Sequence, residues 1–242
     1  MRRNYGETWV YESIIGAVPG IDISERAAVL IQFVVFETAV LLLAWYYGLW
    51  TAAVAGTAAV AVAAVGSVGM LRISTLVRSV ATPEPYRRLL FGSSIEVVLS
   101  VFAFVALVTH LFVFDPRTGG TLLSSLFGPD PPVLAVYLTL LVLWDLCYRI
   151  GTGWWASVVA LWRSLRYRFD AETALRLRRA DAETLGFGFL QLLLIPFVLD
   201  QPVLLVAVVG HVLAVTVVAG LSIIVLTVRE PESDYWDFIR LN

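Results

Sequence analysis

Hydrophobic residues gather along this chain in six long runs that polar segments separate. An α-helix rises about 1.5 Å per residue and a bilayer core is about 30 Å thick, so about 20 apolar residues span it. The pattern predicts six transmembrane helices, at about residues 27–50, 51–71, 90–114, 133–150, 184–199 and 203–228. The fifth run is short and contains Pro196, so the sequence leaves open whether this segment crosses fully.

The arginines divide between the two sides of the membrane that these spans define. Only Arg117 of the 17 arginines falls in a predicted outer loop. The other arginines lie at the end of the fourth span or in the segments 1–26, 72–89, 151–183 and 229–242. Because cytoplasmic loops carry an excess of positive residues, these segments are predicted to be cytosolic. We therefore expect three helical hairpins in the cytoplasmic membrane, with both termini inside.

A partly helical polar segment precedes each odd-numbered span, at residues 8–18, 73–80 and 156–179. We expect short interfacial helices there, with arginine-rich faces that lie on anionic lipid headgroups rather than on nucleic acid. The third segment contains the sequence Asp-Ala-Glu-Thr at Asp170 and leads to the same sequence at Asp181. Aspartate at a helix start accepts backbone N–H bonds, so both are predicted to be N-caps.

The second span contains only Ala, Val, Gly, Thr and Ser between Thr51 and Met70. Small residues recur at spacings of three and four, which lets another helix approach closely. A tightly packed, buried helix is the preferred interpretation. The alternative is that the small side chains leave room for a pore or a lipid groove, which would need polar residues opposite them.

Composition restricts the function further. Hydrophobic residues make up 59% of the chain and charged residues 15%, with a mean hydropathy of +0.83, as expected of one integral membrane domain covering residues 1–242. The sequence contains two histidines and one cysteine, and it has no metalloprotease, nucleophile-elbow or phosphate-loop motif. We therefore expect neither an enzyme nor a bound cofactor or metal.

Every fixed positive side chain is an arginine, because the chain has no lysine. Together with the abundance of Val and Ala and the acid-leaning polar segments, this composition resembles that of uncharacterised six-span integral membrane proteins of haloarchaea. The resemblance implies a host and a span pattern, and it implies no activity.

The candidate functional residues are the polar ones inside the spans, where a charge is costly and usually faces the bundle interior. Glu37 lies near the middle of the first span with no basic neighbour on its own helix. As a neutral acid it donates a hydrogen bond to a neighbouring helix, or as a titrating acid it binds a cation or relays protons. His211 in the sixth span and Gln191 in the fifth are the side chains expected to complete a site with Glu37.

Three further ionisable residues are secondary candidates. Glu96 is near the cytosolic end of the third span, where it can reach water or pair with Arg87 or Arg88. Asp145 and Arg149 are four residues apart on the fourth span, which favours an ion pair within that helix.

Two functions are consistent with these features. The first is a non-catalytic accessory or scaffold role, in which the protein holds a membrane protein partner or a second copy of itself. The second is a small transporter or a proton or cation permeation protein that uses Glu37. If the carboxyl group of Glu37 bonds within one chain, the scaffold hypothesis is favoured. A ring of Glu37 residues in an oligomer would favour permeation.

Overall fold

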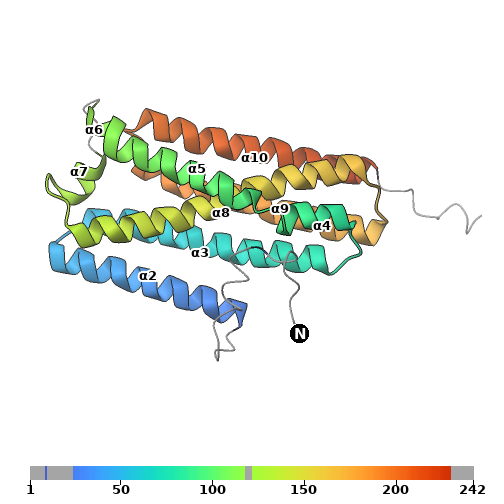
Figure 1. Cartoon of the computed structure of the whole chain (residues 1–242), viewed down its shortest axis with the longest axis horizontal. Helices are drawn as coiled ribbons and strands as arrows, with labels where there is room; N and C mark the ends of the chain where they lie inside the picture. Colours follow the sequence, from blue (N-terminus) through green and yellow to red (C-terminus); the bar gives the residue numbers. More distant parts are fainter. Residues whose placement is uncertain (1–8, 10–23, 118–121, 230–242) are drawn as a thin grey trace, which may run out of the picture.

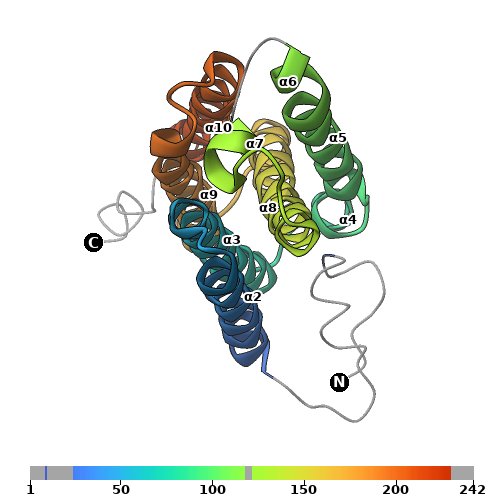
Figure 2. The same ribbon diagram turned by 90° about the vertical axis from the view of Figure 1, so that its left-hand side faces the viewer.

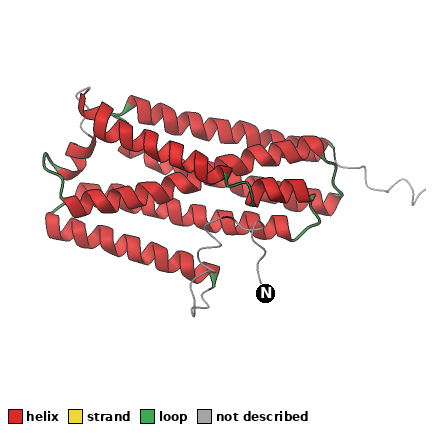
Figure 3. Cartoon of the chain, in the orientation of Figure 1, coloured by secondary structure: helices red, strands yellow, loops and turns green. Residues whose placement is uncertain are grey.

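The structure of the protein is a computed structural model that describes residues 9, 24–117 and 122–229. Within these residues it consists of helices and connecting loops, without a strand (Figures 1 and 3). Six helical stretches are long and apolar enough to cross a membrane, namely Glu25–Tyr47, Trp50–Arg78, Glu84–Arg117, Val133–Arg166, Ala171–Phe197 and Pro202–Val228. The prediction of an all-α bundle with six spans is confirmed, and the chain is a multi-pass membrane protein.

The six spans are arranged as a central group and an outer group (Figure 2). The central helices are α3 (Trp50–Arg78), α8 (Val133–Arg166) and α9 (Ala171–Leu190). The outer helices are α2 (Glu25–Tyr47), α5 (Ile95–Thr109) and α10 (Pro202–Val228). Helix α2 packs on α3, α5 packs on α8, and α10 packs across both α8 and α9. The outer helices are the least buried spans and expose large apolar side chains, as helices in contact with lipid do.

Helix α2 is capped at both ends, and a tight turn joins it to α3. Ser24 caps its start, because the hydroxyl of Ser24 accepts a hydrogen bond from the backbone N–H of Ala27 at 3.2 Å. The helix ends at Gly48, which has a φ of 71° and so adopts the left-handed conformation that glycine tolerates best. Helix α3 begins two residues later, so α2 and α3 form an antiparallel hairpin.

The small residues of α3 permit the close packing that the sequence predicts. Ala59, Ala63 and Gly66 are buried where α3 meets its neighbours. A Cβ atom at Gly66 would lie only 2.5 Å from the ring of Phe187 on α9 and 3.2 Å from the Cβ of Arg149 on α8. Helix α3 is therefore the element around which α2, α8 and α9 assemble.

The third span is interrupted near its start. The short helix α4 (Glu84–Phe91) is followed by a break at which Ser94 has a φ of 54°, an uncommon conformation for a residue with a side chain. The last carbonyl groups of a helix have no partner within it. Two tryptophans supply partners here: the indole N–H of Trp155 donates to the carbonyl of Leu89, and that of Trp9 donates to the carbonyl of Leu90, each at 2.9 Å. These bonds attach α4 to the bundle.

The fourth and fifth spans are longer than the sequence predicts. Residues 151–166 continue α8 instead of leaving the membrane domain, and residues 171–183 already belong to α9. Likewise, residues 73–78 are the last part of α3. The interfacial helices expected at 73–80 and 156–179 are therefore not separate elements, because their buried faces pack into the bundle. The helix expected at 8–18, except Trp9, and the tail beyond Arg229 lie outside the described residues.

Asp170 is the N-cap of α9, as predicted. Its Oδ1 accepts a hydrogen bond from the backbone N–H of Thr173 at 2.9 Å. This bond stabilises the carboxylate and lowers the pKa of Asp170 below its usual value.

The lowered pKa makes this cap sensitive to acid. A carboxyl group whose pKa is lowered in the folded state stabilises the fold above its unfolded pKa, about 3.9, and this contribution disappears as the pH falls through the folded pKa. We expect Asp170→Asn, which keeps a capping oxygen, to lose less stability than the parent between pH 5 and pH 2. Unfolding midpoints across this range check it, with Asp200→Asn, an exposed carboxylate elsewhere, as the control. An equal acid dependence in the parent and Asp170→Asn would contradict the assignment.

The fifth span changes its helical geometry toward its end. Helix α9 gives way to the 3₁₀ helix η2 (Gln191–Phe197), which contains Pro196. Proline cannot donate the backbone hydrogen bond that an α-helix needs at this point. A short turn then leads to Pro202 at the start of α10.

The arginines are concentrated at one end of the bundle. This end, here called the arginine-rich end, is where α4 and α9 begin and where α3, α8 and α10 end, and α2 begins short of it (Figure 1). It contains Arg26 on α2, the arginines of α4 and α9, and Arg229 after α10. At the opposite end, the described residues include one arginine, Arg117 in the short helix α6 (Asp115–Arg117).

Candidate functional site

Glu37 is half-buried in the middle of α2 and forms a hydrogen bond within the chain. Its Oε1 accepts a hydrogen bond from the hydroxyl of Thr57 on α3 at 2.8 Å. Its Oε2 is buried and has no partner among the described residues. The sequence contained the signal for this contact. Glu37 and Thr57 lie about ten residues before and after the α2–α3 turn, and such positions in an antiparallel hairpin face each other at the same level.

The structure does not bring Glu37 and His211 together. His211 lies on α10, and its ring centroid is 6.2 Å from that of Trp154 on α8. Helices α2 and α10 are on opposite sides of the bundle, with α3, α8 and α9 between them (Figures 1 and 2). Gln191 is buried at the junction of α9 and η2 and shares no hydrogen bond with either residue. The three predicted members of one site therefore belong to separate environments.

The predicted ion pair between Asp145 and Arg149 is confirmed. The Nη2 of Arg149 is 2.8 Å from the Oδ1 of Asp145, one helical turn away on α8. The side chain of Arg149 is completely buried and also contacts the sulfur of Met70 on α3. Because α8 continues to Arg166, the pair lies in the middle of this helix rather than at its end. The positive charge of Arg149 is therefore balanced by Asp145 inside the bundle.

Glu96 is fully buried in the first turn of α5. Neither of its carboxyl oxygens has a hydrogen-bond partner among the described residues. The expected pairing with Arg87 or Arg88 is absent, because Arg88 instead bonds to Glu84 one turn earlier on its own helix. One turn beyond Glu96, Ser100 faces α8 and approaches the carbonyl of Tyr148 at 3.4 Å. Glu96 is therefore on the face of α5 that packs against α8 and not on a water-exposed surface.

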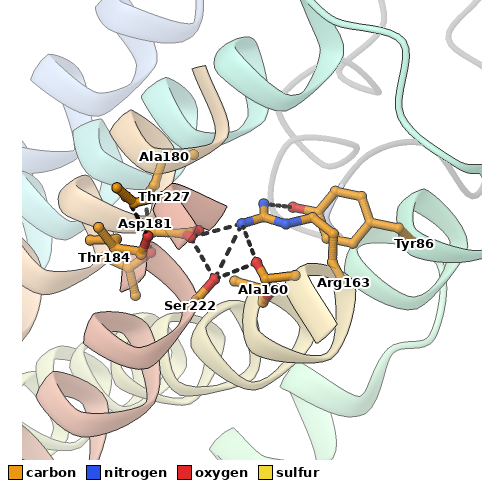
Figure 4. A network of polar contacts seen from close by, with 10 residues as sticks. Tyr86, Ala160, Arg163, Ala180, Asp181, Thr184, Ser222 and Thr227 are labelled. Carbon is orange, nitrogen blue, oxygen red and sulfur yellow. Dashed lines mark hydrogen bonds and ion pairs between the residues drawn. The ribbon is translucent and has the colours of Figure 1, made fainter. Parts of the chain in front are cut away.

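The most extensive polar cluster was not predicted from the sequence. It centres on Arg163 near the end of α8 and joins four helices (Figure 4). The Nη2 of Arg163 is 2.7 Å from the Oδ2 of Asp181 on α9, and both side chains are buried. The hydroxyl of Ser222 on α10 donates to the same Oδ2 at 2.7 Å. The Nη1 of Arg163 donates to the hydroxyl of Tyr86 on α4 at 3.0 Å.

This cluster corrects the prediction for Asp181. Asp181 is not an N-cap, because it lies in the interior of α9 and its carboxylate points to α8 and α10. The two Asp-Ala-Glu-Thr segments have the same local sequence, but only the first follows a non-helical connection. If the residues on both sides of Asp181 are taken as one continuous helix, Asp181 falls on the same face as Leu177 and Thr184, which are buried. That pattern was the available signal for an internal carboxylate.

The small residues at the start of α3 border an apolar cavity of about 140 Å³. Helices α2, α3 and α8 and the short helix α7 (Leu122–Phe127) supply its walls. Thr139 is the polar residue of this lining, and its hydroxyl is already bonded to the carbonyl of Ala135. An apolar lining of this kind offers ordered water few hydrogen-bond partners. The polar residues that a pore along α3 would need opposite the small side chains are not present in this lining.

Comparison with known proteins identifies one family. The family of unknown function DUF7530 matches residues 4–222 of the chain. No curated protein and no solved structure matches it.

Proposed function

Because the chain belongs to the family of unknown function DUF7530, membership assigns no activity, and we propose a role from the geometry of the bundle. The protein is a non-catalytic accessory or scaffold component of the cytoplasmic membrane. The observation that carries this proposal is the hydrogen bond from Thr57 to Glu37. It engages the central carboxyl group within one chain, which is the arrangement expected of a structural residue rather than of a conducting site.

The buried ion pairs support the same role. The carboxylate of Asp145 is paired with Arg149 and that of Asp181 with Arg163, both inside the bundle. Buried charges of this kind favour one arrangement of helices over others, at little net gain in stability. A rigid bundle in which both buried arginines are paired with carboxylates suits a protein that holds a partner in place.

The arginine distribution supports an orientation for this scaffold. We place the arginine-rich end and both termini in the cytoplasm, because positive residues are retained on that side. The exposed arginines at this end then meet the anionic headgroups of the inner leaflet, where each contributes about 1 kcal/mol of attraction. Labelling of single cysteines introduced at Arg166 and at Asp130, in cells, tests the orientation: an impermeant reagent is expected to reach only position 130.

The scaffold role predicts that purified protein conducts no protons. In liposomes with a pH-sensitive dye, we expect flux from the parent protein equal to that of empty vesicles, and the same result for Glu37→Gln. Flux in the parent that disappears in a correctly folded Glu37→Gln variant would contradict the proposal. Parallel runs with Na⁺ and K⁺ gradients extend the test to cations.

The scaffold role also predicts that the protein binds a partner in a fixed stoichiometric ratio. Mild solubilisation of native membranes is expected to yield a complex in which a second membrane protein, or a second copy of this chain, co-purifies through size exclusion. A strictly monomeric protein without a partner at the concentration of native membranes would contradict the scaffold role.

A permeation role is the second candidate, because one observation favours it. The Oε2 of Glu37 is buried and has no partner in the part of the chain that the structure describes, so this oxygen is able to hold a proton or contact a cation. The flux measurement with Glu37→Gln separates the two candidates. Thr57→Val is the useful companion variant, because it removes the hydroxyl that engages Glu37 and leaves the carboxyl group in place.

A further inference from the structure

A broad groove opens at the arginine-rich end between α2, α3 and α9. Its volume is about 760 Å³, far larger than that of the apolar cavity near α7. Each of the three helices contributes one arginine to its walls, namely Arg26, Arg72 and Arg179. All three side chains are exposed. The groove is therefore accessible from outside, and its lining has three arginines and two carboxylates, Glu25 and Glu183.

Two of these arginines are free to bind an anion. Arg72 is engaged with Glu183 on α9 at 3.2 Å. Arg26 and Arg179 form no ion pair or hydrogen bond with any described residue. Glu25 is the second carboxylate of the lining, and it lies in the first turn of α2 with an interaction of its own. The groove thus presents two guanidinium groups without a partner among the described residues, one on α2 and one on α9.

Deeper than Arg72, the groove is lined on α3 by apolar side chains. Val68 and Leu71 form this wall, and Ala182 lies across from it on α9 next to Glu183. Val68 is four residues before Arg72 on the same face of α3, so it lies about 6 Å deeper along the helix axis. This distance corresponds to the step from the headgroup layer to the start of the hydrocarbon. A ligand that fits has an anionic head and a hydrocarbon body.

We propose that this groove is a specific binding site for one anionic phospholipid. The phosphate lies between Arg26 and Arg179, because guanidinium groups bind phosphate oxygens with paired N–H donors. The acyl chains run along Val68 and Leu71 toward the bilayer centre. In the membrane, this placement rests on the proposed cytoplasmic position of the arginine-rich end. The groove is part of the folded chain, so it is also present in protein solubilised in detergent. A binding test in detergent is therefore independent of the orientation in the membrane and of the scaffold role.

Native mass spectrometry of the full-length protein in detergent tests the proposal. We expect one molecule of phosphatidylglycerol to bind at concentrations at which phosphatidylcholine does not. Inorganic phosphate at millimolar concentration is expected to leave the complex intact, because free phosphate makes no contact with the apolar wall. Equal binding of both phospholipids, or displacement by inorganic phosphate, would overturn the assignment.

A pair of double variants locates the site. Arg26→Gln with Arg179→Gln is expected to weaken phosphatidylglycerol binding about thirtyfold, at about 1 kcal/mol for each arginine. The control is Arg166→Gln with Arg168→Gln, which removes the same charge from exposed positions at the same end but outside the groove. The control is expected to bind as the parent does. An equal loss in both double variants would show diffuse attraction to a positive surface and would overturn the proposal.

A third variant changes shape and keeps all charges. Ala182 is exposed and lines the groove, so Ala182→Trp fills part of it. We expect this variant to lose phosphatidylglycerol binding while its circular dichroism spectrum and thermal midpoint match those of the parent. Unchanged lipid binding in a folded Ala182→Trp protein would place the lipid elsewhere.

Discussion

Replacement of Asp181 by alanine is expected to destabilise the protein by about 3–5 kcal/mol, the largest effect of any single substitution considered. The substitution leaves the guanidinium group of Arg163 in the bundle interior without its carboxylate. An unpaired buried charge costs far more than the intact pair contributes. Ser222 also loses the acceptor of its 2.7 Å hydrogen bond, although its hydroxyl keeps the contact with that of Ser164 at 2.8 Å. Reversible unfolding in sodium dodecyl sulfate, followed by circular dichroism, measures the free energy of unfolding.

Two comparisons make this result specific to the buried pair. Arg163→Met combined with Asp181→Leu is expected to recover most of the lost stability, because apolar residues can replace a buried pair at little cost. Glu172→Ala breaks the exposed pair with Arg176 on the same helix and is expected to cost less than about 1 kcal/mol. If Asp181→Ala cost no more than Glu172→Ala, the cluster would not be a structural contact between the helices.

Replacement of Gly151 by leucine is expected to cost about 3 kcal/mol, the second largest effect. Gly151 lies where α8 meets α5, and a Cβ atom there would be 3.0 Å from the backbone nitrogen of Ser100 and 3.2 Å from its Cα. These are backbone atoms, so a rotamer change cannot relieve the clash. Helix α5 must move away from α8. The same unfolding measurement reports the cost, and Gly151→Ala is expected to give a smaller loss in the same direction.

Gly210 provides the matched control for this substitution. Gly210 lies on α10, and nothing lies within 4 Å of a Cβ atom placed there. Gly210→Leu is therefore expected to leave stability unchanged or to raise it, since leucine has the higher helix propensity. A comparable loss at both glycines would mean that the α5–α8 contact is not the cause.

The number and class of the spans were predictable because hydropathy acts over about twenty residues at a time. The apolar runs that begin at Ala27 and Val203 correspond closely to α2 and α10. The ends of α8 and α9 were not predictable in the same way. Arg163 and Arg166 make the end of α8 look like a cytosolic segment, and only its packing against α9 and α10 shows that Arg163 faces inward.

The candidate site was predictable where its contacts are local and not where they are distant. The pair of Asp145 and Arg149 follows from a spacing of four residues on one helix. The partner of Arg163 is 18 residues away on the next helix, so it depends on how α8 and α9 are oriented. The prediction that His211 faces Glu37 was wrong, because the sequence does not give the order of the helices around the bundle.

The connectivity of the Arg163 cluster has a consequence for synthesis of the protein. Arg163 and Asp181 come from consecutive helices that a short connection joins, so their ion pair can form as soon as α9 has left the ribosome. The two charges can then enter the membrane insertion machinery as one neutral ion pair. Ser222 is synthesised 41 residues after Asp181 and joins a pair that already exists. The last helix thus completes the cluster, and its arrival at Asp181 marks the end of assembly.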